Sequence, residues 1–252
     1  MSDDADLKFD EVYNDPDAEL TLISSDGVAF RTHKYHLQSC SNVFRGMISD
    51  LSAADKDSST ITFTDSQIEC ASVLRLFLDV IRGNPPPMVH NILPAFRDCV
   101  SFCRKYECKP TVHILSHLAT QFLLGPEIDP HYIYRIAALL DDVHLATAVI
   151  REKGSYFWSS ELDLDPPQGW LTDAELKMRE NPAEFVSPDR SRIMRVSTWP
   201  IWEVRHLPTL YLTALMKLER EESFEESKLP QTAESFKSIM LEWKRAHPGA
   251  SF

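Results

Sequence analysis

Residues 18–48 carry the pattern that most restricts how this chain can fold. Apolar and polar residues alternate in two short runs, 20–22 and 28–30, as they do in half-buried strands. The Asp26-Gly27 step between the runs is typical of a hairpin turn. Beyond Thr32 the apolar residues recur at helical spacing, which predicts two short helices that meet near Ser41. The segment therefore predicts a β-hairpin followed directly by a helical hairpin.

The chain that follows predicts one more strand and several helices. Residues 52–59 are polar and predict a loop, and residues 60–64 alternate as a third strand does. Helical spacing then predicts helices over 68–83, 89–105 and 111–124. Pro85-Pro86-Pro87 separates the first two of these, because proline fits neither a helix interior nor a central strand.

A set of residues in this region occurs in the order typical of one family. The set is Glu19, Leu20, Leu22, Asp26, Gly27, Phe30, His33, Lys34, Leu37, Ser41, Phe44 and Met47. This order resembles the opening of a BTB/POZ domain, and Arg104-Lys105-Tyr106-Glu107 is similar to a later helix end of that family. The resemblance covers residues 17–124. It implies an α+β BTB/POZ fold, in which a cluster of helices flanks a small three-stranded sheet, and it implies a protein-interaction module.

The finer placement within the family depends on the loops. The hairpin, the triple-proline loop and the overall spacing most resemble the stand-alone BTB proteins of mushroom-forming (basidiomycete) fungi. Two features depart from the family pattern. Arg82 stands where the family commonly has tyrosine, and Pro85–Pro87 replaces a short strand.

The two ends of the chain are expected to differ from this domain. Residues 1–16 are acidic and are expected to form a mostly flexible leader, anchored near its end by Phe9, Val12 and Tyr13. Residues 125–252 are expected to form a helical C-terminal extension, with helices over 130–140, 142–153, 208–222 and 233–245. Between them, residues 154–207 combine prolines with aromatic residues and predict irregular structure pinned by buried rings. An exposed aromatic recognition surface is the alternative for this segment.

Composition excludes several classes of function. The net charge of -12, with lysines and arginines scattered along the chain, gives no electrostatic support for nucleic-acid binding. No apolar run approaches the roughly 20 residues that a membrane span needs, and the acidic N-terminus lacks the layout of a secretory signal. An intracellular protein is expected, in the cytoplasm or the nucleus.

The cysteines and histidines raise the question of a metal site. Five cysteines make an odd number, which argues against a complete disulfide framework. Cys99, Cys103, Cys108, His113 and His117 suggest zinc, but the cysteines lie inside helical patterns rather than at the tight spacing of structural zinc sites. Buried free thiols and surface histidines are the favoured interpretation. No metal or cofactor is expected.

A search for catalytic motifs finds no nucleophile elbow, phosphate-binding loop or zinc-protease motif, and seven glycines leave few places to cradle a phosphate. His33, followed by His36, is the most tempting catalytic candidate. The plainer interpretation is that His33-Lys34 marks a structural corner where strand becomes helix.

The favoured function is therefore non-catalytic association of the chain with itself or with another BTB protein. Two groups of residues are the candidate interaction surface: Val43, Phe44, Met47 and Ile48 for self-association, and Phe63, Asp65, Ile68 and Glu69 for the family's other role. That role, as a substrate adaptor that docks a cullin scaffold of a ubiquitin ligase, is the alternative function. A hydrolase-like enzyme is the remote alternative. The apolar residues of the first group would face the core if they do not form an interface.

Overall fold

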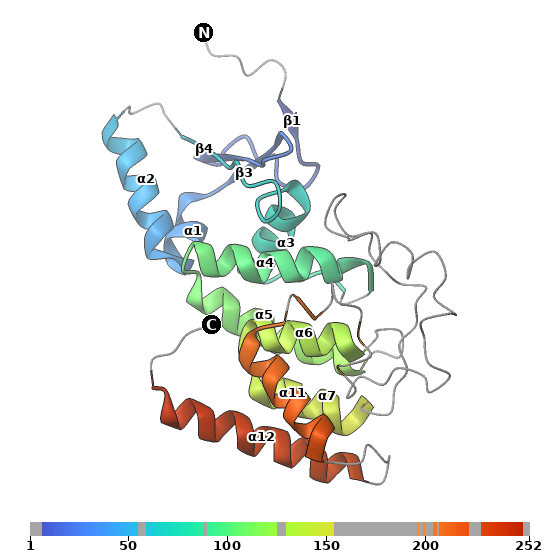
Figure 1. Ribbon diagram of the computed structural model, residues 1–252. Coiled ribbons are helices and arrows are strands. Elements are labelled where there is room, and N and C mark those ends of the chain that lie inside the picture. Colours follow the sequence, from blue (N-terminus) through green and yellow to red (C-terminus); the bar gives the residue numbers. More distant parts are fainter. Residues whose placement is uncertain are drawn as a thin grey trace, which may run out of the picture. The chain divides into compact units, whose positions relative to one another are not determined.

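A computed structural model describes residues 7–54, 59–87, 90–124, 130–153, 207–221 and 228–248, together with Val196, Trp199, Val204 and Arg205. The chain divides into two compact units, residues 1–118 and 119–252. The boundary lies inside a helix, a little before the predicted boundary at residue 124. The first unit combines a sheet with helices, whereas the elements described in the second are helices (Figure 1).

The sheet of the first unit has four strands, β1 (Lys8–Phe9), β2 (Leu20–Ile23), β3 (Val28–Thr32) and β4 (Thr60–Thr62), in the order β1-β3-β2-β4. The predicted hairpin is confirmed: β2 and β3 pair antiparallel, with Leu22 opposite Phe30. Gly27 has a φ of 83° in the turn, a conformation that glycine adopts at little cost. β4 is the predicted third strand and pairs parallel with β2.

The fourth strand, β1, was not predicted. Lys8 and Phe9 pair parallel with Val28 and Ala29 of β3. Farther along, Tyr13 is buried with 2% of its surface exposed, and its hydroxyl donates a hydrogen bond to Asp79, 2.6 Å away. Residues 7–13 are thus ordered rather than flexible, and Tyr13 is one of the residues expected to anchor the leader, while residues 1–6 lie outside the described part of the chain.

The helices of the first unit are α1 (Lys34–Cys40), α2 (Asn42–Ala54), α3 (Ala71–Ile81), the 3-10 turn η2 (His90–Ile92), α4 (Leu93–Lys105) and α5 (Lys109–Leu124). α1 packs against α2, and α3 against α4 (Figure 1). The two short helices were correctly predicted, as was the absence of helix or strand at Pro85–Pro87. Three aromatic rings, from Phe44, Phe77 and Phe102, meet in the core, with centroids 5.0 to 6.1 Å apart.

Some helix ends differ from the prediction. α2 continues to Ala54, where a loop was expected, because Ser52-Ala53-Ala54 is compatible with a helix. α5 begins at Lys109 because Pro110 fits in a first helical turn. α3 begins at Ala71 rather than Ile68, and the reason lies in the polar network described below.

The second unit contains the helices α6 (Pro130–Leu140), α7 (Val143–Lys153), α11 (Thr209–Glu221) and α12 (Leu229–Ala246), close to the predicted ranges. α7 packs against both α6 and α12. The rings of Tyr134, Tyr211 and Phe236 lie 5.9 to 6.2 Å apart in its core. The helical extension is thus confirmed.

Most of segment 154–207, including Tyr156, Phe157, Trp158, Trp170 and Trp202, lies outside the described residues, so its predicted irregular structure stays a prediction. Trp199 is buried, edge-on to Tyr134. Within the described parts of the chain, the helices are too short or too polar to cross a bilayer.

Candidate interaction site

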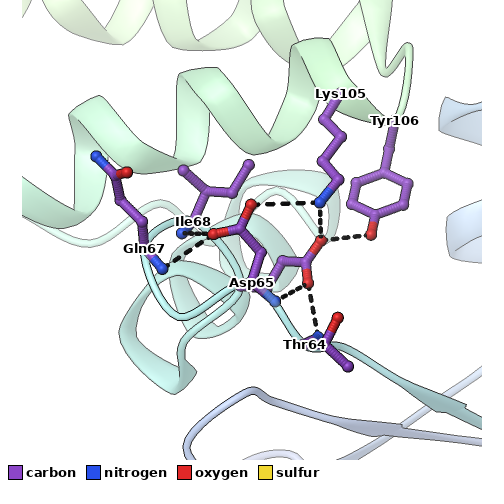
Figure 2. A network of polar contacts seen from close by, with 7 residues as sticks. Thr64, Asp65, Gln67, Ile68, Lys105 and Tyr106 are labelled. Atoms are coloured by element: carbon purple, nitrogen blue, oxygen red, sulfur yellow. Dashed lines mark hydrogen bonds and ion pairs between the residues drawn. The ribbon is translucent and has the colours of Figure 1, made fainter.

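A polar network surrounds Glu69 in the first unit. Only 2% of its side chain is exposed. One carboxylate oxygen accepts hydrogen bonds from the backbone N–H groups of Thr64 (2.8 Å) and Asp65 (2.7 Å). The other accepts from Lys105 Nζ (2.7 Å) and from the Tyr106 hydroxyl (2.6 Å). Figure 2 shows Lys105 and Tyr106 reaching down from the end of α4 toward the turn that holds Thr64 and Asp65.

These donors determine the charge of Glu69. Burial alone would raise the pKa of the carboxyl group, because it disfavours the charged form. The hydrogen bonds from Lys105, Tyr106 and the two backbone amides outweigh burial and lower the pKa of Glu69 to about 2. Burial and the adjacent Glu69 raise the pKa of the Tyr106 phenol. At neutral pH the group is therefore a carboxylate held by a protonated lysine and a neutral tyrosine.

The network fixes the turn over residues 64–70. Asp65 Oδ1 accepts hydrogen bonds from the backbone N–H groups of Gln67 (3.0 Å) and Ile68 (3.4 Å), and Asp65 Oδ2 lies 3.4 Å from Lys105 Nζ. At the other end of the turn, Asp26 of the hairpin accepts from the N–H of Ala71 at 2.8 Å. Asp65 thus holds a tight turn over residues 65–68, and Asp26 binds the first backbone N–H of α3. Together they explain why α3 begins at Ala71, three residues later than predicted.

Tyr106 connects this polar network to the apolar core. Its ring stacks on Phe44 (4.8 Å between centroids, 14° between planes) and lies edge-on to Phe63 at 5.7 Å. Its backbone carbonyl accepts a hydrogen bond from the Ser41 hydroxyl, between α1 and α2. The ring contacts of this one residue thus reach both groups of the predicted interaction residues.

The structure divides the eight predicted interaction residues by burial. Phe44, Ile48, Phe63 and Glu69 are buried within the unit. Val43, Met47, Asp65 and Ile68 are partly exposed. The latter four are the side chains that a partner could touch without unfolding the unit, and the buried four position them.

Most of the family-pattern residues have structural roles. Leu20, Leu22, Phe30, Leu37 and Phe44 are fully buried. His33 is the residue before α1, and its Nδ1 lies 3.0 Å from Glu19 Oε2. Glu19 also accepts a hydrogen bond from the backbone N–H of Lys34. His33 therefore lies where β3 ends and α1 begins, in agreement with the plainer sequence interpretation.

The candidate zinc ligands are not brought together. Cys99, Cys103 and Cys108 are buried, whereas His113 and His117 are exposed on α5. Over the described residues, no group of three or more histidine, cysteine or acidic side chains is arranged to hold a metal ion. A hydrogen bond that the Cys108 thiol donates to Cys103, together with burial, raises the pKa of Cys108, which disfavours the metal-binding thiolate.

Two members of the network, Lys105 and Tyr106, were not among the predicted site residues. Their resemblance to a family helix end was visible in the sequence, but their contact with Glu69 was not. Glu69 is 36 residues from Lys105 and 37 residues from Tyr106 in the sequence, and it lies on a different element. Glu69 itself was proposed as a surface contact, and only the structure shows how deeply it is buried.

Part of the chain matches a known protein family. Residues 13–90 match the family model of the BTB/POZ domain. No curated protein matches the chain. The BTB/POZ domain is a protein-interaction module of a generally non-catalytic family, and the mixed sheet and helices of the first unit agree with its α+β fold.

Proposed function

We propose that this chain, whose residues 13–90 carry a BTB/POZ domain, is a non-catalytic interaction protein that associates with a second copy of itself or with another BTB protein. The observation that carries the proposal is that four of the predicted interaction residues are buried and support the other four, which are partly exposed. A fully satisfied buried network holds Asp65 and Ile68 on a fixed turn, while the core ring of Phe44 anchors the helix that presents Val43 and Met47. Side chains held in place before binding lose less conformational entropy when a partner docks.

We place the surface for self-association on α2. Val43 and Met47 are four residues apart and therefore lie on the same face of the helix, and both are partly exposed. Such a stripe of apolar side chains is the kind of surface that helix-to-helix interfaces bury. Lys8 and Phe9 pair with β3 of their own chain, and the association proposed through α2 leaves this pairing in place.

The test is the mass of the full chain in solution. Wild-type protein at micromolar concentration is expected to show twice the 28.8 kDa monomer mass by light scattering. Met47→Glu places a charge in the proposed interface and should return the monomer. Ser49→Glu, on an exposed position of the same helix, is the matched control and should remain dimeric. Circular dichroism checks that both variants are folded. Wild-type protein that is monomeric under these conditions would exclude self-association.

The second candidate function is that of an adaptor for a cullin-type ubiquitin ligase. It is supported by the partly exposed Asp65 and Ile68 on the rigid turn. Arg82, which departs from the family pattern, serves the fold of this chain: its guanidinium lies 5.2 Å from the Tyr13 ring centroid. Pull-down with a purified cullin scaffold tests this function, with Ile68→Asp expected to abolish capture and Glu242→Gln, on α12, to preserve it. A wild-type chain that captures no scaffold would end the adaptor proposal.

The cellular setting is also a proposal. All five cysteines are free thiols, which is the usual state in the reducing cytoplasm or nucleus. We also propose, from the sequence resemblance, that the chain is similar in kind to the stand-alone BTB proteins of fungi.

A further inference from the structure

Two histidines lie on α5. His113 and His117 are four residues apart on a helix that runs without interruption from Lys109 to Leu124. Both side chains are exposed. Residues at this spacing lie one above the other on a helix face, with Cβ atoms roughly 5–6 Å apart. The backbone of α5 therefore holds two imidazoles next to each other at the surface.

This arrangement suits a transition-metal ion. Imidazole nitrogens bind Zn²⁺ at about 2.0–2.1 Å and also suit Cu²⁺ and Ni²⁺. Two rings one helical turn apart can reach the same ion while the helix stays intact, so no chain ordering opposes binding. The residues between them, Ile114, Leu115 and Ser116, carry no charge that would repel a cation.

The pair differs from the Cys/His zinc site that the sequence argument disfavoured. That site needed the buried thiols of α4 and its following turn, which remain in the core. The pair alone supplies two ligands, and within the described part of the chain no third histidine, cysteine or carboxylate completes a larger group. Water or buffer molecules would occupy the other coordination positions, so moderate and exchangeable binding is expected.

We propose that His113 and His117 form a surface chelating site for a divalent transition-metal ion. By the general order of affinities, Cu²⁺ binds more tightly than Ni²⁺ or Zn²⁺. Mg²⁺ and Ca²⁺, which prefer oxygen ligands, do not bind there.

The experiment uses the full chain without a histidine tag and titrates it with CuCl₂ and, separately, ZnCl₂ by calorimetry. His113→Ala and His117→Ala are each expected to weaken binding at the tightest site by about tenfold or more, because each leaves only one of the two imidazole ligands. His144→Ala removes an exposed histidine on α7 and should leave the affinity unchanged. Equal affinities in wild-type protein and both α5 variants would overturn the proposal.

A second variant controls for the number of histidines. The double substitution His117→Ala with Gln121→His keeps that number but moves one ring two turns away from His113, about 12 Å along the axis. It should bind as weakly as His117→Ala, and the Cu²⁺ electron paramagnetic resonance spectrum should lose the signature of two coordinated nitrogens. Wild-type affinity in this variant would show that the spacing is irrelevant and would contradict the chelate. Unchanged melting temperatures without metal confirm that the variants are folded.

Discussion

At the scale of single residues, the first unit depends on Glu69, a buried carboxylate that accepts four hydrogen bonds. An isolated buried charge is costly, but here each oxygen has a cationic, hydroxyl or backbone donor. The arrangement connects the strand β4, the turn before α3 and the end of α4. A single side chain thus holds three elements at the proposed interaction site.

Glu69→Gln is expected to destabilise the folded chain at neutral pH by about 2–4 kcal/mol, because the variant leaves Lys105 and the amides without their charged acceptor. The folded-state pKa of about 2 lies below the usual glutamate value. The carboxylate therefore contributes stability above about pH 4.5, and this contribution is lost as the pH falls toward 2.

Urea denaturation at pH 7 and pH 3 measures this effect. The difference between wild type and Glu69→Gln should shrink at the lower pH, whereas Glu11→Gln, an exposed control in the same unit, should show no difference at either pH. A difference that stays constant with pH would contradict the assigned charge state.

Two non-glycine residues with positive φ provide a matched pair of predictions. Glu107 (φ 53°) and Asp141 (φ 57°) both lie just after a helix, where glycine is the usual residue. Glu107 is exposed, so Glu107→Gly should stabilise the chain by about 0.5–1 kcal/mol through relief of backbone strain.

Asp141→Gly should instead destabilise the chain by about 1–2 kcal/mol. The Asp141 side chain accepts hydrogen bonds from Lys244 (2.7 Å) and Tyr211 (3.1 Å), and their loss outweighs the backbone gain. Thermal denaturation compares the two variants with wild type. A change in melting temperature of the same sign for both variants would refute this explanation.

At the scale of elements, the short strand β1 is held in place by side-chain contacts more than by its backbone pairing with β3. It has two paired residues. Beyond it, Asp10 binds Arg75 at 2.5 Å, and Tyr13 packs under Arg75 and Arg82. These contacts come from α3 and from Arg82 directly after it, far away in the sequence, and they explain how an acidic segment with few apolar residues is ordered.

Asp10→Asn is accordingly expected to loosen residues 7–13 without unfolding the unit. The backbone N–H of Arg31 donates to the Tyr13 carbonyl at 2.7 Å, so its hydrogen exchange should accelerate. Exchange followed by mass spectrometry over residues 7–13 and 28–32 tests this expectation, with Asp17→Asn as the exposed control. Equal protection in both variants would mean that the ion pair with Arg75 does not hold β1.

At the scale of the whole molecule, the sequence was sufficient where structure follows from local pattern. The hairpin at Asp26-Gly27 and the helical pair around Ser41 could be inferred in this way, and the α+β fold class was implied by the resemblance to the BTB/POZ family. The sequence was insufficient where distant residues decide the outcome. β1 depends on α3, and the start of α3 depends on the turn held by Asp65 and on the hydrogen bond from the Ala71 N–H to Asp26. The burial of Glu69 depends on α4, so its role as a support rather than a contact could not be inferred.

The net charge of -12 bears on association as well. Two copies repel each other at long range, while the proposed contact through Val43 and Met47 is apolar. Raising the salt concentration from about 20 to about 150 mM shortens the screening length to about 8 Å and should therefore strengthen self-association several-fold. Light scattering across a salt series measures this. Weaker association at higher salt would indicate an interface made of ion pairs instead.

The most direct test of the central claim, that this chain is an interaction module acting first on itself, is sedimentation equilibrium of the unmodified protein over a micromolar concentration series. The expected result is a reversible monomer–dimer equilibrium that Met47→Glu abolishes and Ser49→Glu preserves. A mass of 28.8 kDa at every concentration would contradict the claim.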